Sequence, residues 1–183
     1  MIKIKILNQD EEVQSFYYIH IHDEMKDIKN IDTSLGKETR INSCLELARL
    51  QNNLYNNKIL PKFLHNNILA TEANIEFVRQ AYYKDYPSRF SCIFAVADLE
   101  TLNLIKTKYN WDTPVKKIIP SSKAKIIKCD MNWIDFLRTA PPYNQDHYIY
   151  YLAGIDFKEA FPELNIIPIY EYLIEGYCEI VDI

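Results

Sequence analysis

The sequence predicts a mixed α+β fold, formed as a single domain over residues 1–183. Strand and helix patterns are interspersed along the chain without the regular strand–helix–strand rhythm of a doubly wound parallel sheet, and the chain finishes on two strand patterns. Hydrophobic residues make up 48% of the 183 positions and charged residues 25%, which is the composition of a globular chain long enough to bury one core. No repeat, low-complexity tract or linker in the sequence marks a domain boundary.

The first part of the chain alternates between strand and helix patterns. Three segments with alternating, aromatic or β-branched residues predict strands, namely 2–6, 16–22 and 91–96. Apolar residues at helical spacing predict a helix over 38–57. Thr71 has the side chain to cap a second helix, which Pro87 stops. Asp98 is placed to cap a third helix that runs to about Lys108.

The second part of the chain begins with two short strand patterns, over 115–119 and 124–129, which a Pro-Ser-Ser turn separates. Asp130 starts a short helix that carries large apolar side chains. Another helix is expected over 144–153, because Gly154 follows it in the position where a helix commonly stops.

The chain ends in two strand patterns, 166–174 and 177–183, which we expect to pair as a hairpin that turns at Glu175-Gly176. Glu171 lies on the first of them and shares a face with three apolar residues, Ile167, Ile169 and Leu173. The other face is apolar and aromatic as well, so a buried carboxylate here is unfavourable unless a partner or a chemical role compensates for its desolvation. The alternative is that the strand lies near an edge of the sheet and Glu171 reaches water.

Composition excludes several classes of protein. With only 3 Gly, the sequence has no Gly-rich phosphate-binding loop. No apolar run reaches the roughly 18 residues of a membrane helix, and the first residues alternate rather than form the apolar block of a signal peptide. The 4 Cys are widely spaced, which favours buried thiols over a zinc or disulfide framework. We therefore expect a soluble, cytoplasmic protein without a metal site.

Charge is distributed unevenly along the chain. Residues 1–105 carry 12 basic and 14 acidic groups, residues 106–129 carry 7 basic and 1 acidic, and residues 130–183 carry 2 basic and 10 acidic. The middle block, with a net charge of +6, could attract the phosphates of a nucleotide or nucleic acid. The alternative is a solvated helix end followed by an exposed strand face, because the lysines are not interleaved with stacking aromatic residues.

Two further segments could carry chemistry. His20 and His22 lie on one face of the predicted strand 16–22, but no cysteine or carboxylate cluster at matching spacing supports a metal site, which favours core or edge histidines over metal ligands. The segment Ser88-Arg89-Phe90-Ser91 runs from Pro87 into a strand, where its hydroxyls could hold a ligand or serve as ordinary turn residues.

The order of these segments resembles the ADP-ribosyltransferase superfamily, particularly its bacterial toxin and phage-defence branches with a His–Tyr–Glu type site. The segments that carry the resemblance over residues 15–183 are Tyr18-Ile19-His20-Ile21, Pro87 to Phe94 ahead of Asp98-Leu99-Glu100, Tyr151-Leu152-Ala153-Gly154, and Tyr170 to Gly176. The resemblance implies a split β-sandwich of two small, strongly bent sheets with flanking helices, which leave a cleft for NAD as co-substrate.

The resemblance also implies roles for individual residues. Glu171 would be the catalytic glutamate, which stabilises the oxocarbenium-like ribose left when nicotinamide departs. His20 would bind the nicotinamide-side ribose. Ser88 and Ser91 would support the cleft wall, with Arg89 between them among the NAD-binding residues. Either Tyr82 or Tyr83 would stack on nicotinamide.

Two features depart from the family pattern. Members that modify arginine carry Glu or Gln two residues before the catalytic glutamate, and Ile169 stands at that position here. Ser88 and Ser91 are also further apart than the serines of the family's Ser-Thr-Ser triplet. The first departure argues against a guanidinium as the acceptor.

The expected function is the transfer of ADP-ribose from NAD to a macromolecule, with nucleic acid favoured over protein, by a toxin or phage-defence effector. An active cytoplasmic transferase needs restraint, which makes a cognate antitoxin a candidate partner. The alternative is a catalytically silent NAD- or partner-binding domain of the same fold.

Overall fold

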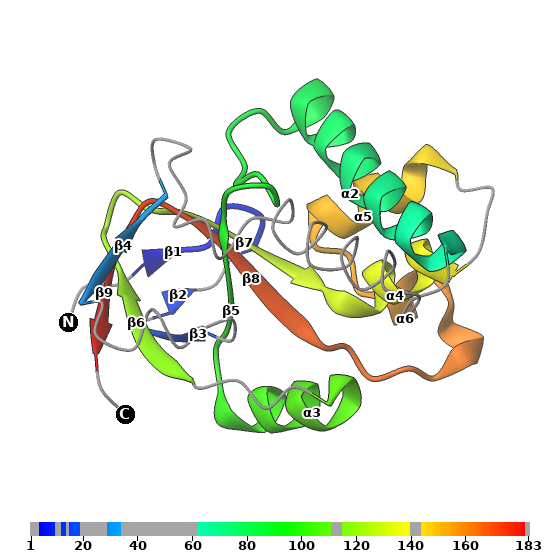
Figure 1. Cartoon of the computed structure of the whole chain (residues 1–183). Coiled ribbons are helices and arrows are strands. Elements are labelled where there is room, and N and C mark those ends of the chain that lie inside the picture. The colour runs from blue at the N-terminus through cyan, green and yellow to red at the C-terminus, as the bar shows by residue number, and fades with distance from the viewer. Residues whose placement is uncertain are drawn as a thin grey trace.

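A computed structural model describes residues 4–9, 12–13, 15–18, 29–33, 62–110, 115–139 and 144–181. These residues form a mixed α/β structure with one seven-stranded sheet and a separate two-stranded ribbon (Figure 1). All the strand pairs are antiparallel, and the order in the large sheet is β4-β9-β6-β3-β5-β8-β7. The α+β class predicted from the sequence is confirmed.

The ribbon consists of β1 (Ile4–Lys5) and β2 (Glu12–Val13). The strands of the sheet are β3 (Phe16–Tyr18), β4 (Asn30–Asp32), β5 (Ile93–Val96), β6 (Lys116–Pro120), β7 (Lys125–Asp130), β8 (Tyr170–Glu175) and β9 (Tyr177–Val181). The helices are α2 (Lys62–Tyr82), α3 (Leu99–Tyr109), α4 (Met131–Thr139), α5 (Gln145–Ala153), α6 (Phe157–Ala160) and the 3₁₀ turn η2 (Pro162–Leu164).

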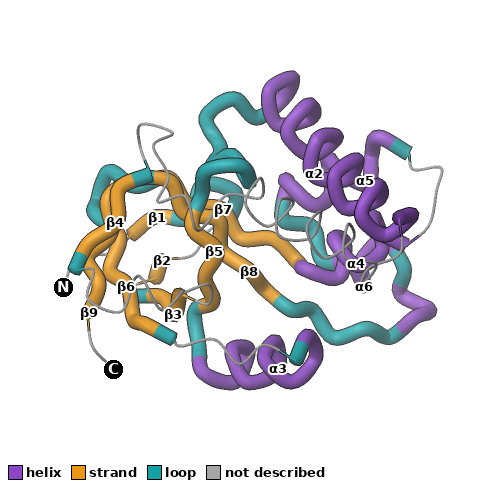
Figure 2. Tube along the Cα trace, in the orientation of Figure 1, coloured by secondary structure: helices purple, strands orange, loops and turns teal. Residues whose placement is uncertain are grey.

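The sheet separates two hydrophobic cores. On one face, residues such as Phe94 and Leu173 pack with Trp133 and other side chains from α2, α4 and α5. On the opposite face, Phe16 and Ile174 belong to a smaller core. Figure 2 shows the strands gathered on one side of the molecule and α2, α4, α5 and α6 on the other, with β7 and β8 reaching between them. The central strands are thus covered on both faces, as the apolar sequence around Glu171 predicts.

Elements that depend on local signals lie where the sequence predicts them. The Asp98 carboxylate accepts a hydrogen bond from the Thr101 backbone N–H and starts α3. Gly154 ends α5 in the left-handed region, with a φ of 73°. The strands β5, β6 and β7 and the helix α4 also occupy the predicted segments. The helix predicted over 38–57 lies outside the described residues.

The start of α2 differs from the prediction. The helix already includes Lys62, so Thr71 lies in its interior and does not cap it. The Thr71 hydroxyl is buried and donates a hydrogen bond of 3.1 Å to the backbone carbonyl of Leu137 in α4. From the sequence alone, a threonine that links two helices cannot be distinguished from one that caps a helix. The contact of Thr71 with Leu137 therefore explains why Thr71 was wrongly predicted to be a cap.

The predicted hairpin at the end of the chain is wrong. Strand β8 pairs with β5 and β7, whereas β9 pairs with β4 and β6. The chain bends at Gly176, which has a φ of 133°, and passes from one part of the sheet to another (Figure 1). A glycine between two strand patterns signals a change of direction, but it does not specify whether the two strands then pair.

The resemblance implied two separate small sheets. The described strands outside the ribbon instead form a single hydrogen-bonded sheet. Within the described residues, no helix is long and apolar enough to cross a membrane.

We predict that Gly176→Ala lowers the free energy of unfolding by about 2 kcal/mol, because a side chain at this φ is strained. The new Cβ would also lie 3.0 Å from the Cα of Ala124 in the facing turn. Urea denaturation measures the change. Ser122→Ala, an exposed position in that same turn, is the control and should stay within about 0.5 kcal/mol of the wild-type protein. Equal stability of Gly176→Ala and the wild type would contradict this account of the bend.

Candidate functional site

Charged and phenolic side chains from several elements meet inside the helix-covered core. We call them the Glu171 cluster, which consists of Glu171 on β8, Arg89 before β5, Tyr151 on α5, Glu72 on α2 and Arg138 on α4. Relative exposure is 3% for Glu171, 5% for Arg89, 3% for Glu72 and 0% for Tyr151. Charges this deeply buried need partners, and the cluster supplies them.

Glu171 is held in place through contacts to one of its carboxylate oxygens. Its Oε1 accepts a hydrogen bond of 2.8 Å from Arg89 Nη1 and another of 2.8 Å from the Tyr151 hydroxyl. Arg89 Nη1 also donates to the Tyr151 hydroxyl. In the part of the chain that the structure describes, the second oxygen, Oε2, accepts no hydrogen bond. The carboxylate is therefore fixed through one oxygen by a cation and a phenol.

The sheet register determines where Glu171 points. Leu173 lies opposite Phe94 on β5, and Glu171 lies opposite Cys129 on β7, so all of these side chains face the helices. Continuing the β5–β8 register by one residue brings Val96 alongside Glu171, and Val96 in turn pairs with Tyr17 on β3. The alternative that Glu171 reaches water at an edge is excluded, because β8 is paired on both sides and the side chain is buried.

Arg89 is held by several contacts at once. Its Nε donates to Glu72 Oε2 at 2.7 Å and its Nη2 to Glu72 Oε1 at 3.4 Å, while Nη1 faces Glu171. The guanidinium carbon also lies 4.8 Å from the ring centre of Phe94 and 5.4 Å from that of Tyr151. This combination of a two-point contact with a carboxylate and aromatic faces suits arginine and would not suit lysine.

A stripe of charged residues on α2 positions the segment that contains Arg89. Glu72, Glu76 and Arg79 lie four and three residues apart, which places them on one side of a helix. Glu76 accepts a hydrogen bond of 2.8 Å from the Ser88 hydroxyl, and Arg79 Nη1 donates to the backbone carbonyls at positions 84 and 86. These contacts hold positions 84, 86 and 88, in the segment between the end of α2 and β5, against the helix.

The cluster has clear electrostatic preferences. Burial raises the pKa of Glu72, but the guanidiniums of Arg89 and Arg138 outweigh this effect and hold the pKa at about 2. Burial and the neighbouring Glu171 raise the pKa of Tyr151 well above its usual value, although Arg89 opposes them. The Tyr151 hydroxyl thus keeps its proton and can donate it in a hydrogen bond to Glu171.

The described cysteines are buried thiols. Burial raises the pKa of both Cys92 and Cys129 well above the usual value, although Arg89 opposes this in each case. Since the thiolate is the reactive form, neither side chain is suited to act as a nucleophile. Cys178 is buried as well, and Cys44 lies outside the described residues.

The other predicted site residues are placed less centrally. The Ser88 hydroxyl is bound to Glu76, and the backbone of Ser91 is bonded to the carbonyl of Ser88. Tyr82 is 60% exposed and accepts a hydrogen bond from Gln145, while Tyr83 stacks on Tyr86 with ring centres 4.9 Å apart. His20 and His22 lie outside the described residues. Of the predicted residues, the structure thus brings Glu171 and Arg89 into direct contact.

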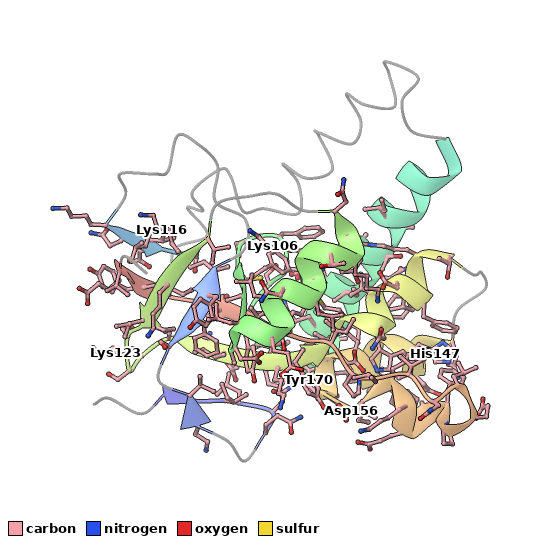
Figure 3. All side chains as sticks on the ribbon, turned by 90° about the horizontal axis from the view of Figure 1, so that it is seen from below. Lys106, Lys116, Lys123, His147, Asp156 and Tyr170 are labelled. Atoms are coloured by element: carbon pink, nitrogen blue, oxygen red, sulfur yellow. The ribbon has the colours of Figure 1, made fainter. Side chains whose placement is uncertain are left out.

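The lysine-rich block does not form one uniform positive surface. Lys108 pairs with Asp135 at 2.8 Å, Lys125 with Glu175 at 3.5 Å, and the Lys128 ammonium lies 4.1 Å from the ring centre of Tyr170. Figure 3 shows Lys116 and Lys123 toward the end of the molecule away from His147, with Lys106 between them and that residue.

Glu72, Arg138 and the contact of Tyr151 with Glu171 are not predicted from the sequence. The sequence holds a signal for Glu72, because the charged stripe on α2 runs beside the apolar stripe of Ile75 and Val78 and must therefore approach the core. Arg138 has no comparable signal, since basic residues are common in the last turn of a helix.

The fold and the site define a mixed α/β protein whose antiparallel sheet carries a buried carboxylate, guanidinium and phenol cluster beneath three helices. The chain belongs to the family described as protein of unknown function (DUF2441), whose model matches residues 2–132. The matched part contains Glu72 and Arg89 and ends before Tyr151 and Glu171. No curated protein matches the chain.

The low pKa of Glu72 leads to a prediction about acid stability. A carboxyl with a pKa of about 2 in the folded state and 4.5 when unfolded stabilises the protein above pH 4.5, and this contribution disappears as the pH falls toward 2. The shift corresponds to roughly 3.5 kcal/mol, at about 1.4 kcal/mol per pH unit. We expect the free energy of unfolding to fall less between pH 5 and pH 2.5 in Glu72→Gln than in the wild type, as measured by urea titrations. Parallel curves for the two proteins would contradict the assignment.

Proposed function

We propose that this protein transfers ADP-ribose from NAD to a macromolecular acceptor, with Glu171 as the catalytic residue. The observation that carries the proposal is the setting of Glu171, a carboxylate held through one oxygen by Arg89 and Tyr151. A fixed carboxylate of this kind suits a reaction in which positive charge develops on a sugar.

In the proposed reaction the bond between nicotinamide and the ribose breaks, and its electron pair leaves with nicotinamide. The ribose becomes oxocarbenium-like, and the negative charge of Glu171 stabilises it. Oε2 of Glu171 would accept a hydrogen bond from a ribose hydroxyl. The acceptor nucleophile then forms a bond to the anomeric carbon and loses its proton to water.

The arrangement of the strands supports the proposal. The resemblance to ADP-ribosyltransferases draws on segments at β3, β5 and β8, and these three strands are consecutive neighbours in the sheet. Tyr17, Val96 and Glu171 form a row across them. Strands that are far apart in sequence thus present adjacent side chains on one face, which is what a site assembled from several segments requires.

One observation favours the alternative, a catalytically silent NAD- or partner-binding domain of the same fold. The Glu171 side chain is only 4% exposed and is ion-paired. A carboxylate in this state can serve the stability of the core alone, and a substrate can reach it only if the covering side chains move.

The discriminating experiment incubates purified full-length protein with NAD and measures the release of nicotinamide, with binding of NAD followed by titration calorimetry. Release of nicotinamide supports the transferase. Binding without release supports the silent binding domain. If the protein neither binds NAD nor releases nicotinamide, the transferase and a silent NAD-binding domain are both contradicted, and a partner-binding domain is supported.

We propose nucleic acid as the acceptor class and an effector role as a toxin or in phage defence, with a cognate antitoxin as partner in the cytoplasm. Support for the acceptor comes from Ile169, which replaces the side chain associated with arginine acceptors, and from the block of basic residues. The ion pairs of Lys108 and Lys125 reduce the positive charge of that block. The proposal is tested on four other lysines of the block, Lys106, Lys116, Lys117 and Lys123.

We predict that the combined replacement of Lys106, Lys116, Lys117 and Lys123 by Gln weakens the labelling of RNA or DNA by a tagged NAD analogue and leaves NAD hydrolysis intact. The slope of labelling against salt should also become shallower, by about one unit for each phosphate that a lysine no longer neutralises. Replacement of Lys84 and Lys158 by Gln, two exposed lysines outside the block, is the control. Label that resists nuclease and disappears with protease would identify a protein acceptor instead.

A further inference from the structure

The two acidic residues of the Glu171 cluster differ in what they contact. Glu171 contacts Arg89 and Tyr151, whereas Glu72 contacts two guanidiniums, those of Arg89 and Arg138. Arg89 offers its Nε and Nη2 side to Glu72 and its Nη1 to Glu171. The guanidinium is planar and its donors are fixed relative to one another, so a carboxylate that holds one edge determines the direction of the remaining donors.

Glu72 is itself well anchored. The neighbouring Thr71 hydroxyl donates to the carbonyl of Leu137, and Arg138 donates to Glu72 Oε1 at 2.7 Å. Consecutive residues of α2 thus contact consecutive residues of α4, which fixes the position of Glu72 relative to the helical core. Within the described part of the chain, Arg89 is the member of the cluster that contacts both Glu72 and Glu171.

We infer that Glu72 is a positioning residue of the site, which acts through Arg89 to hold Oε1 of Glu171. The inference rests on the proposed transferase function and adds a residue to it. Glu72 is buried behind Arg89 and does not touch the reacting atoms. Replacing Glu72 retains the Glu171 carboxylate but releases the Arg89 guanidinium, which fixes the position of that carboxylate. Even a small displacement of a reacting group lowers the rate substantially.

The test is a double-mutant cycle on nicotinamide release, with Glu72→Gln, Arg89→Gln and the combined variant. We expect Glu72→Gln to lower kcat by about 10- to 100-fold with the KM for NAD nearly unchanged. In the Arg89→Gln background the same replacement should change kcat by less than about twofold, because the residue through which Glu72 acts is already absent.

A merely structural role of Glu72 predicts different results, namely a kcat loss that follows the drop in melting temperature and that multiplies with the effect of Arg89→Gln. That outcome overturns the inference, as does a kcat of Glu72→Gln within about twofold of the wild type. If Glu72→Gln does not fold, Glu72→Asp, which keeps the charge and withdraws the carboxylate by one methylene group, takes its place in the cycle. Absence of turnover by the wild-type protein overturns the proposed function and this inference together, whereas wild-type turnover with an additive cycle overturns the inference alone.

Discussion

Replacement of Glu171 by Gln is expected to lower nicotinamide release by about 100-fold or more, the usual range when one electrostatic stabiliser of a transition state is removed. The amide keeps the size of the side chain, and its oxygen can still accept the hydrogen bond from the Tyr151 hydroxyl at Oε1. It loses the negative charge that, in the proposed reaction, stabilises the ribose cation. Steady-state release of nicotinamide measures the rate, and circular dichroism with a thermal melt verifies that the variant is folded.

The chain offers a closely matched control for this variant. Asp135 on α4 also pairs with a cation and a phenol, since it lies 2.8 Å from Lys108 Nζ and accepts a hydrogen bond of 2.8 Å from the Tyr109 hydroxyl. Its side chain is 37% exposed and belongs to a separate group. Asp135→Asn removes the same charge from the same kind of partners and should leave turnover within about twofold of the wild type. Wild-type activity in Glu171→Gln would refute the assignment of Glu171.

The largest stability effect is expected for Asp130→Ala, at the junction of β7 and α4. The carboxylate is 1% exposed. Its Oδ1 accepts hydrogen bonds from the backbone and side-chain amides of Asn132 and from the backbone N–H of Ile169, and its Oδ2 accepts one from the backbone N–H of Phe157. Alanine would leave these buried donors without their acceptor. We expect the free energy of unfolding to fall by about 3 to 5 kcal/mol, a large part of the stability of a typical domain.

Urea denaturation measures this loss of stability. Two further variants serve as controls. Asp130→Asn keeps one carbonyl oxygen as an acceptor and should be destabilised less than Asp130→Ala. Asp146→Ala removes an exposed aspartate from the first turn of α5 and should cost under about 1 kcal/mol. A loss in Asp130→Ala no larger than that in Asp146→Ala would show that the donors of Asn132, Phe157 and Ile169 find other partners.

Local chemistry made several elements predictable. The cap of α3 by Asp98 and the stop of α5 at Gly154 depend on a few consecutive residues, so their signals are complete within the sequence. The sequence also indicated a strand covered on both faces around Glu171, because period-two alternation places this residue between apolar neighbours, but it left open whether the side chain reaches water at an edge. Arg89 lies in a short polar segment, and the neighbouring sequence does not indicate which acidic residue it contacts.

The sequence by itself determined the α+β class, the start of α3, the end of α5 and the choice of Glu171 as the residue to examine, because these follow from propensity, capping and alternation within about one element. Only the tertiary structure decided that β8 and β9 bend apart at Gly176 instead of pairing, and that Thr71 ties α2 to α4. It also decided that Arg89 connects Glu72 with Glu171, residues 99 positions apart in the chain. Strand pairing and buried ion pairs depend on which distant segments the folded chain brings together, and a local sequence pattern carries no information about that choice.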